Sequence, residues 1–356
     1  MKTILPLLAI TLIDSCFATR EPKHIFDAWD KDKDGKLLRE ELPKNARPNF
    51  KRADRNRDGS ISLGEHEAFV SRSRGPRPNP PLPEGLQAFR NLPYADTDNP
   101  RQALDLFLPK ISNSVEILPI IVYIHGGGWK SGSKESALSK LSPYLKTGSF
   151  AVASINYRLS GEAIWPSQIH DCKAAIRWLK GNAKKFRIDT NRLAVWGNSA
   201  GGHLVAMIGV SGEVGSLEGK LGKHLDQDSR VKCVVDFCGP SHLLSMGQFP
   251  SKIDHDAPSS PESLLIGGAL QENKKAANKA SPITYATKDD APILIVHGTD
   301  DPLVPFNQAE IFHSALLKVG VKSEFLGIKG MGHGLGGPEV DKRVRKFLES
   351  QLLGQK

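Results

Sequence analysis

Short apolar runs alternate with helical patterns along most of the chain. The runs with the length and apolar content of buried strands lie at residues 104–108, 120–124, 150–155, 193–196, 231–237, 293–296 and 324–328. Helical stretches such as SQIHDCKAAIRWLKGNAKK and NQAEIFHSALLKVG lie between them. This alternation predicts an α/β fold, a mostly parallel sheet with helices on both faces. In such folds the chemistry lies on loops at the carboxyl ends of the strands.

The first residues follow the pattern of a secretory signal. A lysine precedes an apolar stretch at residues 4–13, and small residues follow up to Ala18. The pattern predicts a signal peptide over residues 1–18 and a secreted or periplasmic protein. Lipidation of Cys16 is the alternative, and Asp14 disfavours it because an acidic residue fits a lipobox poorly. No later stretch is long and apolar enough to span a membrane.

Two regions separate the signal from the α/β pattern. Residues 21–73 form a short, charged region. Residues 74–87 form a Pro-rich stretch that cannot build a helix or a central strand. We therefore predict a small N-terminal domain at 21–73, a linker at 74–87 and the α/β domain at 88–356.

Composition and charge narrow the classes of function. The 356 residues are 39% hydrophobic with a formal net charge of +9, which is ordinary for a soluble globular protein. The chain lacks the Arg-rich runs and aromatic–basic repeats of nucleic-acid binders, so we expect a diffusely basic surface and no nucleic-acid partner. Removal of the signal would leave an odd number of cysteines, Cys172, Cys233 and Cys238. We expect buried thiols, with a Cys233–Cys238 bridge as the alternative.

Two twelve-residue segments of the charged region share one pattern. DKDKDGKLLREE begins at Asp30, and DRNRDGSISLGE begins at Asp54. Both place oxygen ligands at positions 1, 3 and 5, Gly at 6, an apolar residue at 8 and Glu at 12, which is the EF-hand calcium loop. Position 7 would contribute a backbone carbonyl. The candidate Ca²⁺ ligands are Asp30, Asp32, Asp34, Lys36, Glu41, Asp54, Asn56, Asp58, Ser60 and Glu65.

The two loops follow each other closely, which favours a structural calcium site over a switch. Pro43 and Pro48 interrupt any helix between them. Leu37 and Ile61, at position 8 of each loop, are predicted to pair as a short two-stranded contact. The unit resembles the compact EF-hand pairs of secreted bacterial proteins.

GNSAGGHLVA, at residues 197–206, places a serine between glycines. Gly197-Asn198-Ser199-Ala200-Gly201 fits G-x-S-x-G, follows the strand pattern RLAVW and opens a helical run. That context is the one a nucleophile elbow requires, with little bulk at the two glycines so that strand and helix can pass closely. A serine at such a junction can instead be a helix N-cap, but an N-cap does not need both glycines. We therefore predict that Ser199 is a nucleophile.

YIHGGGW, at residues 123–129, ends an apolar strand with three glycines. Backbone N–H groups in such a loop can face an anion without obstruction, as in the HGGG oxyanion hole. The predicted donors are Gly127, Gly128 and the residue after the nucleophile, Ala200. A phosphate cradle is the alternative, and the absence of a P-loop or dinucleotide motif disfavours it.

An acid and a base follow the serine in chain order. PILIVHGTDDPLVP predicts a buried strand that ends in an acidic loop, and KGMGHGLGGPE places His333 before the last helix. We predict Asp301 rather than Asp300 as the acid, because the pattern H-G-x-x-D-x-x-V-P places it four residues after the histidine and Pro302 holds it extended. The order Ser199, Asp301, His333 is that of α/β-hydrolases. Other histidines, His125, His203 and His297, are predicted to be structural.

The motifs together resemble the HGGG-type esterase/lipase group of α/β-hydrolases. HGGGW, INYRLS, IDTNRLAVWGNSAGGHL, HGTDDPLVP and GMGHG carry the resemblance, which spans residues 88–352. The branch most similar is that of bacterial acetyl-xylan and feruloyl esterases. The resemblance implies the α/β-hydrolase fold, ester hydrolysis through an acyl-serine and no catalytic cofactor. It also suggests that residues 239–285 form a short cap.

The leading hypothesis is a secreted serine carboxylesterase acting on short-chain acyl esters, with acetyl or feruloyl groups on polysaccharide as expected substrates. A prolyl-oligopeptidase-like serine peptidase is the second hypothesis, weakened by the HGGG loop and the lack of a propeller domain. A non-catalytic calcium-dependent scaffold is the third, and a complete set of catalytic motifs argues against it.

Overall fold

The computed structural model describes residues 22–43, 46–74, 82–110 and 117–354. The predicted signal peptide, Cys16 and residues 75–81 of the predicted linker lie outside these residues. The chain divides into two compact units, Met1–Asn79 and Pro80–Lys356. Among the described residues, no helix has the length and apolar character needed to cross a membrane.

The first unit consists of short helices around two loops. Its elements are α1 (Pro22–Trp29), β1 (Lys36–Leu37), η1 (Arg47–Asn49), α2 (Phe50–Ala53), β2 (Ile61–Ser62) and α3 (Leu63–Arg74). β1 and β2 pair antiparallel with Leu37 opposite Ile61, as the loop pattern predicts. The small core comprises Phe26, Leu37, Leu42, Phe50, Ala53 and Ile61. Hydrophobic burial in this unit therefore holds the two loops side by side.

The second unit is built on an eight-stranded sheet in the order β10-β9-β8-β7-β5-β6-β4-β3. The strands are β3 (Leu86–Pro93), β4 (Ala103–Pro109), β5 (Leu118–Ile124), β6 (Ala151–Ile155), β7 (Ile188–Asn198), β8 (Cys233–Phe237), β9 (Ile293–Gly298) and β10 (Ser323–Ile328). β3 pairs antiparallel with β4, and β4 pairs antiparallel with β6. The other neighbouring strands of the sheet, in the order β6-β5-β7-β8-β9-β10, pair in parallel. The predicted mostly parallel α/β sheet is confirmed.

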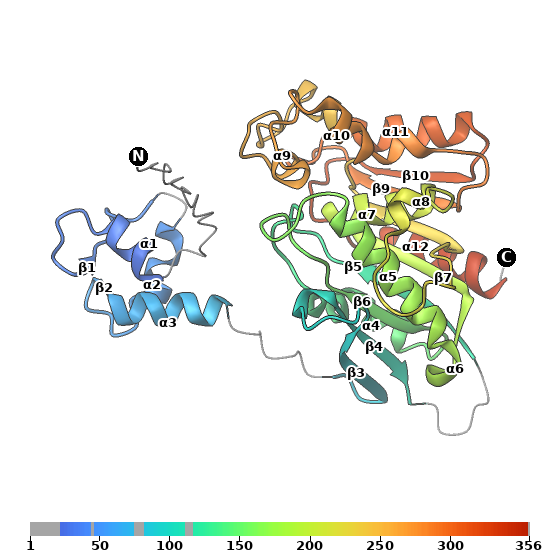
Figure 1. The fold of residues 1–356 in the computed structure, drawn as a ribbon, viewed down its shortest axis with the longest axis horizontal. Helices are drawn as coiled ribbons and strands as arrows, with labels where there is room; N and C mark the ends of the chain where they lie inside the picture. Colours follow the sequence, from blue (N-terminus) through green and yellow to red (C-terminus); the bar gives the residue numbers. More distant parts are fainter. Residues whose placement is uncertain (1–21, 44–45, 75–81, 111–116, 355–356) are drawn as a thin grey trace, which may run out of the picture. The chain divides into compact units, whose positions relative to one another are not determined.

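Helices cover both faces of this sheet. They are α4 (Ala137–Leu145), α5 (Ser167–Gly181), α6 (Ala183–Phe186), α7 (Ala200–Val210), α8 (Gly215–Glu218), α9 (Pro261–Ile266), α10 (Lys274–Lys279), α11 (Asn307–Lys318) and α12 (Pro338–Leu353). Residues of α5, α7 and α11 belong to one core cluster, and residues of α4 and α12 belong to the other. Figure 1 shows α5 and α7 in front of the sheet.

Alternate side chains along the strands belong to the two different core clusters. In β5, Ile120, Val122 and Ile124 join the cluster under α5 and α7, while Ile121 and Tyr123 join the cluster under α4 and α12. Successive side chains of a strand point to opposite faces, so a strand covered on both faces is apolar throughout. This burial is why the short apolar runs identified these strands in the sequence.

β3 was not among the predicted strands. It begins at Leu86, so the last two residues assigned to the linker lie in the sheet. Most of its side chains are half-buried or exposed, and its pairing with β4 shifts between Phe89 and Leu92, where Asn91 has a φ of 54°. An irregular edge strand of this kind lacks the continuous apolar run of a central strand.

The three cysteines of the described residues, Cys172, Cys233 and Cys238, are free and buried. This confirms the expectation of buried thiols over a Cys233–Cys238 bridge. Burial raises the pKa of the Cys233 thiol, because the charged thiolate would lose its hydration. The thiols therefore fill core space as small hydrophobic groups.

Candidate active site

Ser199 lies at the sharp turn between β7 and α7. β7 ends at Asn198 and α7 begins at Ala200, so the serine occupies the junction itself. Its φ of 56° and ψ of −124° are strained for a residue with a side chain. Its N–H donates to the carbonyl of Phe237 at 2.8 Å, and its carbonyl accepts from the N–H of His203 at 3.0 Å. The sheet and the helix thus hold the strained turn at both ends.

The two glycines of G-x-S-x-G lie at a close crossing of strand and helix. A Cβ on Gly197 would lie 2.1 Å from the carbonyl oxygen of Gly201. A Cβ on Gly201 would lie 2.1 Å from the carbonyl oxygen of Ile124 in β5. Both contacts are with backbone, which cannot move aside, so the elbow has no room for a side chain at either position.

The glycine loop after β5 lies against Ser199. A Cβ on Gly126 would be 3.2 Å from the Cβ of Ser199. Gly127 and Gly128 have φ values of 119° and 59°, which favour glycine. Ala200 is the first residue of α7, so its N–H has no acceptor within the helix. The loop of residues 126–129, called the oxyanion loop below, therefore lies beside the nucleophile together with the start of α7.

Asp301 and His333 meet directly. Nδ1 of His333 lies 2.7 Å from Oδ2 of Asp301, and the carboxylate is completely buried. The other oxygen of Asp301 accepts from the N–H groups of Leu303 at 2.8 Å and Val304 at 3.0 Å. Asp300 is exposed and accepts from its neighbour Thr299 instead. The structure thus brings His333 to Asp301 rather than to Asp300.

Asp301 remains ionised despite its burial. Burial alone would raise its pKa, but hydrogen bonds from His297, His333 and the two backbone amides hold the pKa below its ordinary value. His297, predicted to be structural, has Nε2 3.3 Å from Oδ2 of Asp301 and 2.9 Å from the carbonyl of Val304. His297 therefore belongs to the surroundings of the acid, and its place on the H-G-x-x-D motif was the available signal.

Cys238 joins the two parts of the site, and the sequence analysis did not identify it as a site residue. It follows Phe237, whose carbonyl binds the N–H of Ser199, and its Sγ lies 3.9 Å from the carbonyl of His333. The Cys238 sulfur, a carboxylate oxygen of Asp301 and a ring nitrogen of His333 all lie within 4.8 Å of one another. Its position at the carboxyl end of a predicted strand was the signal that could have found it.

Two buried histidines fix the oxyanion loop. Nε1 of Trp129 donates to Nδ1 of His203 at 3.2 Å, and Nε2 of His203 donates to the carbonyl of Ala280 at 2.6 Å. His125 stacks on Tyr157 with ring centroids 4.4 Å apart. Burial lowers the pKa of both histidines to about 4. Both rings are therefore neutral at physiological pH, and His203 can accept from Trp129 only in that state.

Residues 239–285 lie between β8 and β9 and contain α9 and α10. Pro261, the first residue of α9, lies 3.3 Å from the position that a Cβ on Gly128 would take. Nε2 of His255 lies 3.1 Å from the carbonyl of Leu303, in the loop of the acid. This segment, expected to be a cap, therefore touches both the oxyanion loop and the acid loop.

The two loops of the first unit have the form that a calcium ion requires. Gly35 and Gly59 have φ values of 79° and 88°, as position 6 needs. Carboxylate oxygens of Asp30, Asp32 and Glu41 lie within 4.8 Å of one another. Oδ1 of Asp30 and Oδ1 of Asp54 are buried and lack a hydrogen-bond partner within the described ranges. A buried carboxylate oxygen without a donor is costly, and a bound cation would satisfy it, so the residues present fit Ca²⁺.

A serine elbow on this sheet, with an acid and a histidine on the loops after β9 and β10, defines the class of α/β-hydrolases. Residues 104–316 match the BD-FAE family model, and residues 50–70 match an EF-hand model. The chain belongs to the BD-FAE family.

Solved structures and curated relatives agree with this assignment. A truncated carbohydrate esterase from gut microbiota is 35% identical, covers 77% of this chain and 99% of its own, and has a TM-score of 0.71. A bifunctional GH43-CE protein of Bacteroides eggerthii is 33% identical over 74% of this chain and 38% of its own, with a TM-score of 0.69. Esterase LipC of Mycobacterium tuberculosis is 29% identical over 247 residues, 67% of this chain and 58% of LipC. The chain spans about half the length of the curated relatives it matches.

Proposed function

We propose that this protein is a secreted serine carboxylesterase that hydrolyses short-chain acyl esters, with acetyl or feruloyl groups on polysaccharide as its substrates. The observation that carries the proposal is the 2.7 Å contact between His333 and the buried carboxylate of Asp301, which follow β10 and β9 as the Ser199 elbow follows β7. The carbohydrate part is supported by the similarity to a carbohydrate esterase at 35% identity.

The site residues have complementary roles in this reaction. Oγ of Ser199 attacks the ester carbonyl while Nε2 of His333 takes the hydroxyl proton. The ionised Asp301 holds the imidazole through Nδ1 and stabilises the imidazolium. N–H groups of Gly127, Gly128 and Ala200 would stabilise the negative oxygen of the tetrahedral intermediate.

The second half of the cycle uses the same groups. Collapse of the intermediate breaks the C–O bond, and His333 gives its proton to the leaving alcohol, which leaves an acyl-Ser199. A water molecule then attacks the acyl carbon and transfers a proton to His333. Collapse of the second intermediate releases the carboxylic acid and returns the proton to Ser199.

The serine assignment can be tested with a fluorophosphonate probe and p-nitrophenyl acetate. The wild-type protein should be labelled and should turn over the ester, while Ser199→Ala should lose both. Near-normal turnover by Ser199→Ala would refute the nucleophile. A scaffold without catalysis would not be labelled by the probe. A peptidase would be labelled but would cleave prolyl peptides in preference to esters.

We also propose that the two loops of the first unit bind Ca²⁺ in a structural role. Glu41 and Glu65 would each supply a carboxylate at position 12, and their hydrogen bonds to nearby backbone N–H groups already hold them inward. Calorimetric titration of the full chain should give two sites, and Glu41→Gln should remove one of them. Glu40→Gln is the matched control, because the neighbouring glutamate is at a non-ligand position. If the titration shows no heat of binding even at millimolar Ca²⁺, the proposal is refuted.

Export and the linker remain proposals supported by the sequence pattern alone. The predicted cleavage after Ala18 can be checked by sequencing the N-terminus of the protein recovered from culture medium or periplasm. Limited proteolysis should cut between α3, which ends at Arg74, and β3, which begins at Leu86.

A further inference from the structure

A pocket of about 320 Å³ lies next to the oxyanion loop and outside the group formed by Ser199, Asp301 and His333. It is lined by Lys130, Leu159, Ser160, Gly161, Glu162 and Leu264. We propose that this pocket, called the Lys130 pocket below, binds the neutral sugar that carries the ester group. The inference rests on the proposed esterase function and deepens it by locating the alcohol side of the substrate.

The pocket is continuous with the oxyanion loop. Cε of Lys130 lies 4.0 Å from the position that a Cβ on Gly128 would take, so the lysine chain extends over this glycine. The N–H of Ser160 donates to the carbonyl of Trp129 at 2.8 Å, which ties the opposite wall to the same loop. The pocket therefore borders the loop at which the ester carbonyl would bind.

The polar side chains of the pocket suit hydroxyl groups. Lys130 offers donors, Glu162 offers acceptors, and Ser160 offers both. Asn99 donates to Oε1 of Glu162, which orients the carboxylate. Oγ of Ser160 is buried and has no hydrogen-bond partner in the part of the chain that the structure describes. A buried hydroxyl without a partner is unfavourable, and a sugar hydroxyl would satisfy it.

Charge and shape favour a neutral saccharide over other occupants. Lys130 and Glu162 have opposite charges, so the pocket has no net preference for an anionic sugar. An acyl chain would remove water from both charged groups without replacing their hydrogen bonds, which is costly. Leu159 and Leu264 supply an apolar wall, and Leu264 is 41% exposed. The volume lies at the lower end of the range of small-molecule sites, about 300–1,000 Å³, which suits a short saccharide.

The test compares an ester that contains a sugar with one that does not. The readout is the ratio of kcat/KM for acetylated xylo-oligosaccharide to kcat/KM for p-nitrophenyl acetate. Lys130→Ala removes a charged donor, and Glu162→Gln replaces a charged acceptor with a weaker neutral one, so each should lower this ratio about tenfold. Ser160→Ala removes only the unpartnered hydroxyl and should lower the ratio severalfold.

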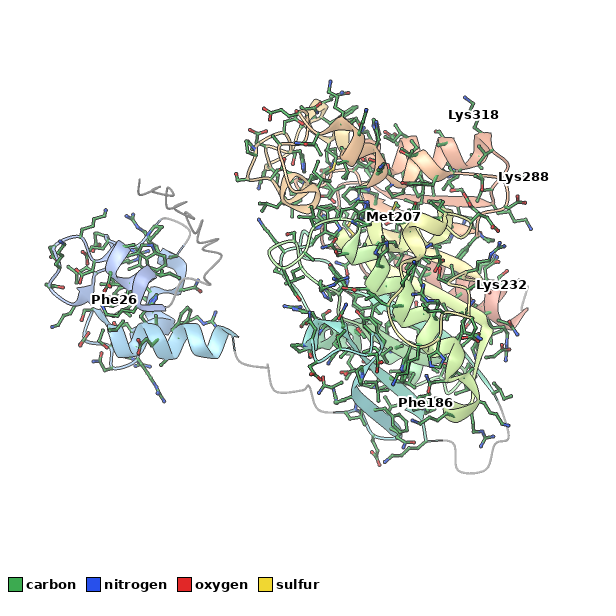
Figure 2. The ribbon with its side chains drawn as sticks, in the orientation of Figure 1. Phe26, Phe186, Met207, Lys232, Lys288 and Lys318 are labelled. Atoms are coloured by element: carbon green, nitrogen blue, oxygen red, sulfur yellow. The ribbon has the colours of Figure 1, made fainter. Side chains whose placement is uncertain are left out.

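Exposed residues elsewhere on the same unit give matched controls. Figure 2 shows the side chain of Lys288 extending outward from the surface, and Lys288→Ala should leave the ratio unchanged. Glu272 is also exposed, and Glu272→Gln is the control for the glutamate. An unchanged ratio in all three pocket variants would overturn the inference, as would an equal loss on both esters.

A binding measurement separates this inference from the proposed function. Xylo-oligosaccharide without acetyl groups is titrated calorimetrically into the Ser199→Ala protein, and Glu162→Gln in that background should weaken binding about tenfold. If the wild-type protein turns over p-nitrophenyl acetate but neither binds the saccharide nor hydrolyses its acetyl ester, the inference fails and the esterase stands. If Ser199 is not labelled and neither ester is hydrolysed, the proposed function itself fails.

Discussion

His255 and Glu262 form a buried pair within the segment of residues 239–285, with Nδ1 of the histidine 3.1 Å from Oε2 of the glutamate. The other ring nitrogen of His255 faces the carbonyl of Leu303, whose own N–H binds Asp301. Glu262 follows Pro261, which packs against Gly128. The pair therefore connects the acid loop to the oxyanion loop, although neither residue belongs to a catalytic motif.

We predict that Glu262→Gln lowers stability and activity together. The substitution alters a buried polar contact, and leaving a buried polar group without a favourable partner typically costs about 1–3 kcal/mol. Urea unfolding should show a reduced free energy of unfolding, and kcat for p-nitrophenyl acetate should fall as the two loops lose their connection. The exposed Glu272→Gln serves as the control. An unchanged unfolding midpoint in Glu262→Gln would show that the His255–Glu262 pair does not stabilise the fold.

The sequence predicted the motif residues because each motif reflects a local constraint. Gly197 and Gly201 could be predicted from the spacing alone, since the crossing of β7 and α7 leaves no room for a Cβ. Asp301 could be chosen over Asp300 for a similarly local reason, because the H-G-x-x-D-x-x-V-P pattern places the acid four residues after the histidine. The roles of His255 and Glu262 could not be predicted, because they depend on the contact of His255 with Leu303, which is distant along the chain.

Asp301→Asn should abolish most of the activity while Asp300→Asn should not. An asparagine can donate where the carboxylate accepts from Nδ1 of His333, which would favour the wrong tautomer and remove the charge that stabilises the imidazolium. We expect kcat to fall about a thousandfold or more. Asp300 is exposed and points to Thr299, so its substitution is a control at the adjacent position. Loss of activity in Asp300→Asn but not in Asp301→Asn would show that Asp300 is the acid.

Gly201→Ala should disrupt the elbow. Its Cβ would lie 2.1 Å from the carbonyl oxygen of Ile124, so strand β5 and helix α7 would have to separate. Overpacking of this kind costs about 1–3 kcal/mol or more, and the displaced turn should lose fluorophosphonate labelling at Ser199. Gly215→Ala is the control, because a Cβ there meets nothing within 4 Å. Full labelling of Gly201→Ala would contradict the close crossing.

Stability should fall in mild acid because His203 is buried in its neutral form. Burial lowers its pKa in the folded protein to about 4, whereas the unfolded chain binds a proton at about 6.5. The unfolded state therefore gains protons first, and the free energy of unfolding should decrease as the pH falls from about 6.5 to about 4. His125 has the same shift and adds to the slope.

His203→Gln should remove one of these two contributions, because glutamine does not titrate. The slope of the free energy of unfolding against pH in this window should decrease by at most about 1.4 kcal/mol per pH unit, the value for one proton. Urea unfolding at a series of pH values measures this slope directly, independently of any loss of stability at neutral pH. An unchanged slope would mean that His203 does not differ in protonation between the folded and unfolded states, and the lowering of its pKa by burial would then be wrong.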